Sequence, residues 1–169
     1  MRQAIIDFHA HAFPDPLAAR AISQLEHGGG VKAFLDGRVS SLLASMDAAG
    51  ITTSVMCSIA TKPEQFEPIL KWSKQIASQR IVPLPSIHPR DPDPVGQARR
   101  VAEAGLVGIK LHPYYQEFNL DDEALFPLYR VLDELGLLVV FHTGLISPFP
   151  GIARGTRFAF AGFSNGCQP

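Results

Sequence analysis

Short apolar stretches alternate along this chain with longer segments in which apolar residues recur at helical spacing. The apolar stretches predict five strands, because short apolar runs flanked by turn-forming residues are typical of buried strands. The predicted strands cover residues 4–9, 52–59, 81–87, 106–111 and 137–141. The last of them is apolar throughout, which predicts a strand covered on both faces.

The segments between these strands predict helices over 17–25 and 39–49, after Pro63, from a turn and helix-start signal at 91–94 to about residue 104, and from about Phe126. Glycines mark several of the helix ends. We expect the triplet 28–30 to break the first helix, and Gly50 and Gly136 to end two others. Because strands and helices alternate, the order predicts an α/β fold with parallel strands and right-handed crossovers.

The pattern changes after Gly144, where residues 147–151 form a cluster of helix and strand breakers. The following residues show neither helical nor strand periodicity, and the last acidic residue of the chain is Glu134. We therefore predict a folded domain over 1–146 and an irregular tail over 147–169 that need not be native to the fold.

Composition narrows the class of protein. With 169 residues, 46% of them hydrophobic and 18% charged, the chain has the profile of one globular domain. A net charge of -1 argues against a nucleic-acid partner, and no apolar run predicts a membrane span. Cys57 and Cys167 lie far apart in the sequence, so we expect no disulfide framework and a cytoplasmic location.

Histidines recur where the predicted strands end, and five of the chain's six histidines follow this rule. In a parallel α/β protein, residues at the carboxyl ends of successive strands face a common site. Histidine is the commonest metal ligand and the usual acid or base near neutral pH. The recurrence therefore predicts a metal-centred site that takes a small-molecule substrate.

His9 and His11 form the sharpest motif, because side chains at i and i+2 of a strand point to the same side. Two such imidazoles can chelate one ion, with Asp7 as a hydrogen-bonding neighbour, although two histidines can also meet at a strand end by chance. His142 follows the most apolar strand and is our candidate third ligand. The alternative for His142 is a core histidine bonded to the main chain.

Lys110 and His112 share one side of the fourth predicted strand. We assign Lys110 to substrate binding, where it would neutralise a carboxylate; the alternatives are a carbamylated lysine bridging two metals and an ion pair inside the sheet. His112 is our candidate catalytic proton donor. His88 fits a loop cap as well as a substrate contact, and we expect His27 to be exposed.

These motifs together resemble the amidohydrolase-related family, the branch of the amidohydrolase superfamily that includes aminocarboxymuconate-semialdehyde decarboxylases. The residues that carry the resemblance are 6–14 with their two histidines, 108–113 around Lys110, and 141–144 around His142. The resemblance extends over about residues 3–146.

The resemblance implies a (β/α)8 TIM-type barrel with a divalent metal, often zinc, at the carboxyl ends of the strands. It assigns His9 and His11 to the ligands of the first strand and His142 to the ligand of the fifth. It also calls for a histidine on the sixth strand and an aspartate on the eighth, and residues 143–169 offer neither. We therefore expect an incomplete barrel of about five parallel strands, truncated after the fifth.

Three functions remain open. The first is a metal-dependent hydrolase acting on a small carbonyl or carboxylated substrate, with a metal-dependent decarboxylase as the near alternative. The second class is an inactive fragment that binds metal or self-associates, because an open sheet leaves unpaired edges that can form a homo-oligomer. A phosphoesterase fits less well, since the sequence shows no phosphate-binding glycine loop.

Overall fold

The structure is a computed structural model that describes residues 4–29 and 32–143. Its strands are β1 (Ile6–Ala10), β2 (Thr53–Cys57), β3 (Ile81–Leu84), β4 (Gly108–Leu111) and β5 (Leu138–Phe141). They form two parallel ladders, β1-β2-β3 and β4-β5. The Lys110 N–H donates to the Pro85 carbonyl at 2.8 Å and joins the two ladders. The predicted α/β class with parallel strands is confirmed.

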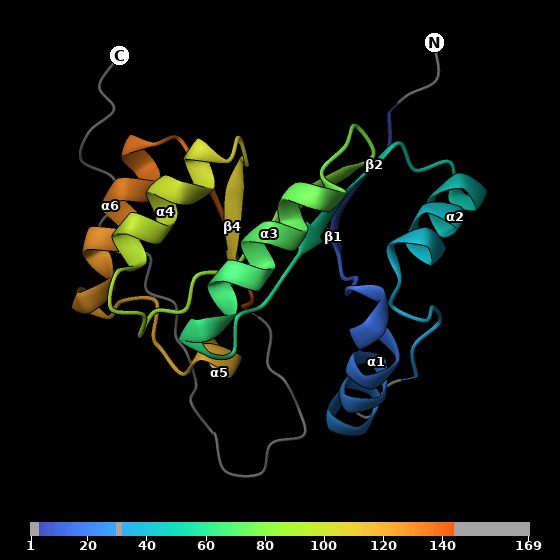
Figure 1. Cartoon of the computed structure of the whole chain (residues 1–169), viewed down its shortest axis with the longest axis horizontal. Helices are drawn as coiled ribbons and strands as arrows, with labels where there is room; N and C mark the ends of the chain where they lie inside the picture. Colours follow the sequence, from blue (N-terminus) through green and yellow to red (C-terminus); the bar gives the residue numbers. More distant parts are fainter. Residues whose placement is uncertain (1–3, 30–31, 144–169) are drawn as a thin grey trace.

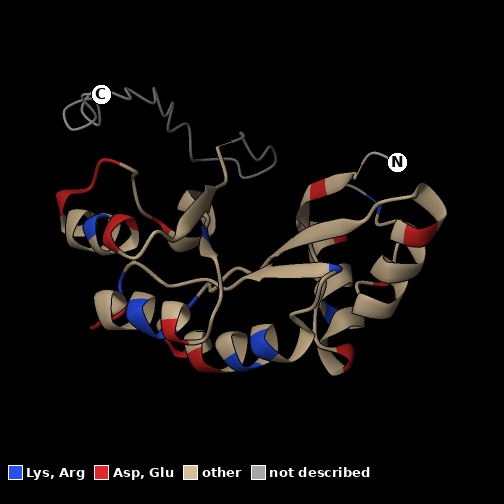
Figure 2. Ribbon diagram, turned by 90° about the horizontal axis from the view of Figure 1, so that it is seen from above, with Lys and Arg blue, Asp and Glu red and all other residues tan. Residues whose placement is uncertain are grey.

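Helices lie on the outer side of the strands (Figure 1). The long ones are α1 (Asp15–Gly29), α2 (Val39–Ala49), α3 (Phe66–Ile76), α4 (Pro94–Glu103) and α6 (Phe126–Glu134). The short ones are η1 (Pro63–Gln65), α5 (Pro113–Gln116) and η2 (Glu123–Leu125). Figure 2 shows the charged residues concentrated on the helices and loops, while the strands are largely uncharged. No helix of the described part is long and apolar enough to cross a membrane.

Most of the predicted elements are found, with strands shorter than expected. α2 has the predicted bounds, and Gly50 ends it in the left-handed conformation at φ 70°. The glycine triplet was expected to break the first helix, but α1 continues through Gly28 and Gly29. Glycine costs a helix only about 1 kcal/mol, and the last turn has few hydrogen bonds to lose. The single turn α5 was not predicted. The tail 147–169 lies outside the described residues.

The core divides into clusters on the two sides of the strands. The larger cluster lies between β4, α4 and α6 and includes Ile109, Val101 and Leu128. A smaller one joins β1 and β2 to α2 through residues such as Met46 and Met56. Side chains from the other side of β2, β3 and β5 form a third, apolar cluster. The strands therefore have two buried faces over part of their area, as parallel strands usually do.

The two edges of the sheet are less covered than the sequence predicts. β5 was expected to be buried on both faces, but Leu138 is 53% exposed and the other residues of β5 are partly exposed. On β1, Ile6 and Phe8 are 59% and 55% exposed. The prediction that β5 is buried on both faces is wrong. The composition of a strand indicates how such strands are usually covered, but it does not show which neighbouring elements are present.

Close packing of β4 on β5 gives a testable prediction. A Cβ added at Gly108 would lie 2.8 Å from the Leu138 Cβ and would also clash with the Leu138 main chain. We expect Gly108→Ala to lower the free energy of unfolding by about 1–3 kcal/mol, because the two backbones must separate. Chemical denaturation measures this change.

Gly28→Ala is the matched control, because no atom of the described residues lies within 4 Å of the added Cβ on α1. It should leave stability unchanged or raise it by up to about 1 kcal/mol. Equal losses in the two variants would contradict the packing of β4 against β5.

Candidate functional site

His9 and His11 lie at the carboxyl end of β1. The register of β1 against β2 shifts between Asp7 and Ala10, and His11 follows the last residue of the strand. The two imidazole rings are nevertheless 4.9 Å apart between centroids. A strand end with a local irregularity thus brings both rings of the motif together.

Hydrogen bonding orients the His11 ring. Its Nδ1 lies 2.8 Å from the main-chain oxygen of Cys57 at the end of β2. A carbonyl oxygen can only accept, so Nδ1 carries the proton and Nε2 keeps its lone pair. Metal-binding histidines are commonly held by such a bond from the second ring nitrogen. His11 is therefore prepared to bind an electrophile through Nε2.

Both rings favour the neutral form. Desolvation lowers the pKa of His9 to about 4, helped by the charges of Lys110, His11 and His142. Desolvation also lowers the pKa of His11, although its bond to Cys57 opposes this. Asp7 raises both pKa values to a smaller extent, and its Oδ1 accepts from the His9 main-chain N–H at 3.2 Å. Neutral imidazole is the form that binds metals.

His112 and His142 stack on each other beyond the ends of β4 and β5. Their ring centroids are 4.1 Å apart and the ring planes differ by 9°. The Nδ1 of His112 accepts from the Tyr115 N–H at 3.4 Å, which leaves the proton on Nε2. Desolvation, followed by the charges of His142 and Lys110, lowers the pKa of His112 to about 3. Near pH 7 this side chain is thus a neutral hydrogen-bond donor and not an imidazolium acid.

Lys110 is completely buried in β4, and its Nζ has no hydrogen-bond partner among the described residues. The ion pairs found within the described ranges do not include it, so they give no support to a pair inside the sheet. Desolvation lowers its pKa, partly opposed by Cys57. Its positive charge lowers the pKa of His9, His11 and His112. These side chains therefore lie close enough to Lys110 to interact with it electrostatically.

Gln116 is a residue of this region that the sequence analysis missed. It is 1% exposed, and its Oε1 accepts from the His112 N–H at 2.7 Å. Its Nε2 lies 2.9 Å from the carbonyls of both Ala60 and Ile87 and 3.2 Å from the Ser86 hydroxyl. Hydrogen bonds from one side-chain amide therefore connect the segments that follow β2, β3 and β4. No sequence pattern indicates a glutamine with this role.

The other two histidines lie outside this group. His88 is 6% exposed, and its Nδ1 accepts from the Arg90 N–H at 3.1 Å. This hydrogen bond fits the loop cap, the first of the two roles that the sequence left open for His88. His27 is exposed at the end of α1, as expected. Neither shares a ring contact with the strand-end cluster of His9, His11, Lys110, His112 and His142.

The fit of this cluster to a metal ion is partial. Two adjacent neutral imidazoles and the available Nε2 of His11 suit a divalent ion. Within residues 4–29 and 32–143, however, no three His, Cys, Asp or Glu side chains are arranged to hold one ion together. The donor chemistry fits, and the described residues do not complete the ligand set.

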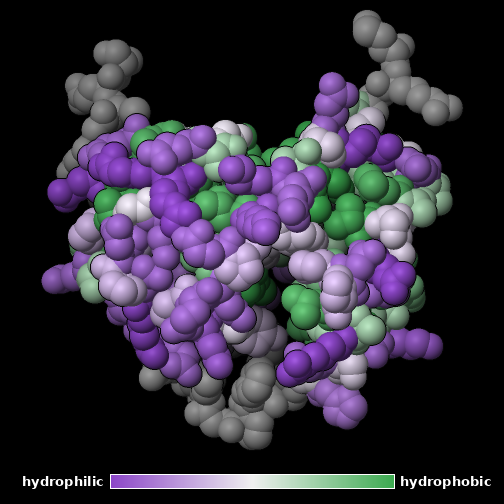
Figure 3. Space-filling model, viewed as in Figure 1, coloured by the Kyte–Doolittle hydropathy of each residue, from purple (hydrophilic) through white to green (hydrophobic). Residues whose placement is uncertain are grey.

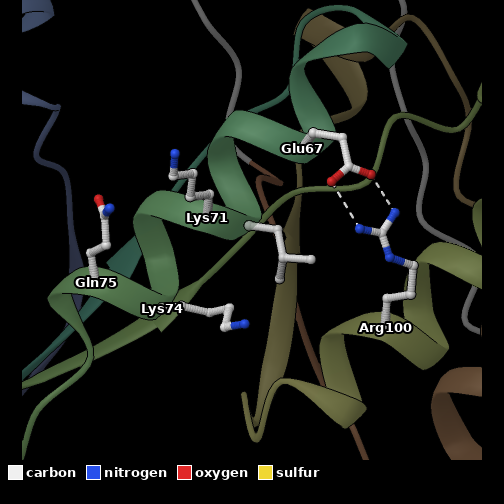
Figure 4. A pocket seen from close by; sticks show the side chains of 6 residues that line it. Glu67, Lys71, Lys74, Gln75 and Arg100 are labelled. Carbon is white, nitrogen blue, oxygen red and sulfur yellow. Dashed lines mark hydrogen bonds and ion pairs between the residues drawn. The ribbon is translucent and has the colours of Figure 1, made fainter.

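A hollow of about 330 Å³ lies elsewhere, between α3 and α4 (Figure 4). Its polar lining residues are Glu67, Lys71, Lys74, Gln75 and Arg100, and Glu67 pairs with Arg100 across it. It is open to solvent on the helical side and contains no residue of the strand-end cluster. We therefore locate the candidate site at the strand ends and not in this hollow.

Comparison with known families finds a match over most of the chain. The sequence profile described as amidohydrolase matches residues 6–165. No curated protein matches the chain.

Solved structures show the same fold at low identity. The 5-carboxyvanillate decarboxylase of Sphingomonas paucimobilis has a TM-score of 0.61 at 16% identity, with 82% of this chain and 51% of that chain covered. The corresponding enzyme of Novosphingobium aromaticivorans, solved with bound manganese, gives 0.57 at 18% identity, covering 82% and 50%. A probable 2-pyrone-4,6-dicarboxylic acid hydrolase of Acinetobacter baumannii, with citric acid bound, gives 0.51 at 16%, covering 83% and 49%. The chain thus spans about half the length of these structures.

The role of Gln116 can be tested by Gln116→Leu. The change replaces the amide with an apolar side chain of similar size and leaves two buried carbonyls and the His112 N–H without their partner. We expect a loss of about 2–4 kcal/mol in the free energy of unfolding. Gln75→Leu makes the same change at an exposed position of α3 and should stay within about 0.5 kcal/mol of the parent. Similar stabilities for the two variants would contradict the role of Gln116 in connecting the segments that follow β2, β3 and β4.

His88 gives a prediction about pH. Desolvation lowers its pKa in the folded protein, so the unfolded chain binds the proton more readily. Stability should therefore fall as the pH drops below the unfolded pKa of about 6.5. His88→Asn keeps an acceptor for the Arg90 N–H and removes the titration, so its stability should fall less between pH 7 and pH 5. His27→Asn, at an exposed site, should follow the parent; a His88→Asn curve parallel to the parent would contradict the prediction.

Proposed function

Because the chain belongs to the amidohydrolase family, we propose that its strand-end cluster carries the chemistry of a metal-dependent hydrolase acting on a small carbonyl or carboxylated substrate. The observation that carries the proposal is the gathering, at the carboxyl ends of the strands, of two imidazole pairs and a buried amine that has no hydrogen-bond partner within the part of the chain that the structure describes. In barrel folds of this kind the active site occupies that end.

His9 and His11 would hold the ion, with His142 as the third protein ligand. Neutral rings and a fixed proton position at His11 support this role. A bound divalent ion supplies electrophilic polarisation of a substrate oxygen and a lower pKa for bound water. We propose zinc; the manganese in a structural neighbour makes that ion the second candidate.

Lys110 and His112 would serve the substrate. A buried amine without a partner is stabilised when an anion enters, so Lys110 suits a substrate carboxylate. His112 presents the Nε2 hydrogen as a donor, because its Nδ1 is already occupied. It would orient a substrate oxygen, and Gln116 would keep its backbone in place.

Decarboxylation is the second candidate. Lys110 favours it, because a buried amine that binds a carboxylate also stabilises charge that develops nearby. A further candidate is a chain that binds metal without turnover, since no acidic ligand joins the histidines within the described part of the chain.

Metal titration tests the proposal. The purified chain should bind one equivalent of Zn²⁺ or Mn²⁺ in calorimetry, and His9→Ala or His11→Ala should weaken binding at least about tenfold. His27→Ala removes an exposed histidine on α1 and should leave the affinity unchanged. Binding that all three variants retain equally would rule out the β1 pair as ligands.

Turnover assays with the metal-loaded chain separate the alternatives. Release of acid or alcohol from esters, amides or lactones indicates a hydrolase, and release of CO₂ from small carboxylic acids indicates a decarboxylase. Lys110→Met should raise KM for carboxylated substrates more than for neutral ones, because it removes the charge and keeps most of the volume. Metal binding with no turnover on either panel would establish the inactive alternative.

A further inference from the structure

The side chain of Lys110 lies in an unusual environment for a lysine. It is 0% exposed, and within residues 4–29 and 32–143 its Nζ meets no hydrogen-bond acceptor and no ion-pair partner. A buried ammonium without a counter-charge is costly, because it gives up its hydration and receives no other contact in return. Burial accordingly lowers the pKa of Lys110. This environment favours the neutral amine, whose nitrogen has a free lone pair.

The stem of Lys110 lies on an apolar face of the strands. Lys110 is paired with Val140 in the ladder of β4 and β5, and paired residues of neighbouring strands point to the same side of the sheet. Val140 packs against the third apolar cluster, which includes Cys57 and Leu84. An apolar surrounding is the setting in which a lysine becomes a nucleophile, because desolvation disfavours its protonated form.

The surroundings of the amine include a way in from solvent and a hydrogen-bond donor. Lys110 interacts electrostatically with His9 and His11, and both of these side chains are exposed. It also interacts with His112, which follows β4 two residues later. The His112 Nε2–H is a donor, because Nδ1 accepts from the Tyr115 N–H. A carbonyl compound that enters from the side of β1 therefore meets a nucleophile and a donor for its oxygen.

We propose that Lys110 is a nucleophile that forms an imine with a small aldehyde or ketone. The Nζ lone pair attacks the carbonyl carbon, while the His112 Nε2–H donates a hydrogen bond to the carbonyl oxygen. The two hydrogens of the amine leave with that oxygen as water, and a carbon–nitrogen double bond remains. Hydrolysis reverses the reaction and restores the amine. The inference goes beyond the proposed function, because it gives Lys110 a covalent role that requires no metal ion.

Reductive trapping of the full chain tests the proposal. The chain is incubated with propanal and sodium cyanoborohydride at pH 7 in the presence of EDTA, and mass spectrometry of its peptides locates the modified lysines. The other lysines are internal controls, because all of them are exposed: Lys32, Lys62, Lys71 and Lys74. An amine with the ordinary pKa of about 10.4 is almost entirely protonated at this pH. We expect Lys110 to be modified at least about tenfold faster than each exposed lysine, because burial favours its neutral form.

Two variants and an unfolded sample are the matched controls. Hydrophilic residues cover much of α3 and α4 in Figure 3, and Figure 4 shows Lys74 on α3. Lys74→Arg removes one exposed amine and should leave the modification of Lys110 unchanged. Lys110→Arg keeps the positive charge and should remove the fast modification, with circular dichroism to confirm the fold. In urea, the parent chain should lose its preference for Lys110, because burial is the cause of that preference.

Two results would overturn the proposal. The first is a folded parent in which Lys110 is modified no faster than the exposed lysines. The second is a preference for Lys110 that persists in urea, since it would then not depend on the fold. Metal titration remains a separate test. Zinc binding without trapping at Lys110 contradicts this inference alone, and trapping in a chain that binds no metal contradicts the proposed function alone.

Discussion

The junction between β3 and β4 determines whether the strand-end residues share one site. The main-chain bond from Lys110 to Pro85 joins the two ladders, and the Gln116 side chain ties the segments after β2, β3 and β4 together. A buried amide with these contacts is costly to displace, because each freed carbonyl would lose its partner away from water. These hydrogen bonds between the segments after β2, β3 and β4 hold His112 and His11 in position relative to Lys110.

Sequence patterns predicted the elements that depend on local signals. α2 has its predicted bounds because its apolar pattern and Gly50 both mark the same end. The end of α1 and the exposure of β5 were missed because each depends on neighbours and not on local composition. The comparison with family profiles and structures supports the family and the barrel-type fold that the motifs suggested.

The sequence selected the members of the candidate site, whose roles stay predictions, but it gave no indication of their contacts. The strand-end rule selected His9, His11, Lys110, His112 and His142, and the structure gathers them by ring contacts and mutual electrostatic effects. The proton positions on His11 and His112 depend on the Cys57 carbonyl and the Tyr115 amide, the first of which is far away in sequence. Gln116 escaped prediction for the same reason, since its partners Ala60 and Ile87 lie on other strands' ends.

The placement of the candidate ligands on the edges of the sheet connects the fold to the chemistry. His9 and His11 lie at the end of β1, and His142 follows β5, so the candidate ligands come from the two strands that have an unpaired edge within residues 4–29 and 32–143. Because desolvation is the largest cause of the low pKa of His9 and His112, further covering would keep these rings neutral. Burial of these strand ends and readiness for metal binding are thus linked, because neutral imidazole is the form that binds a metal ion.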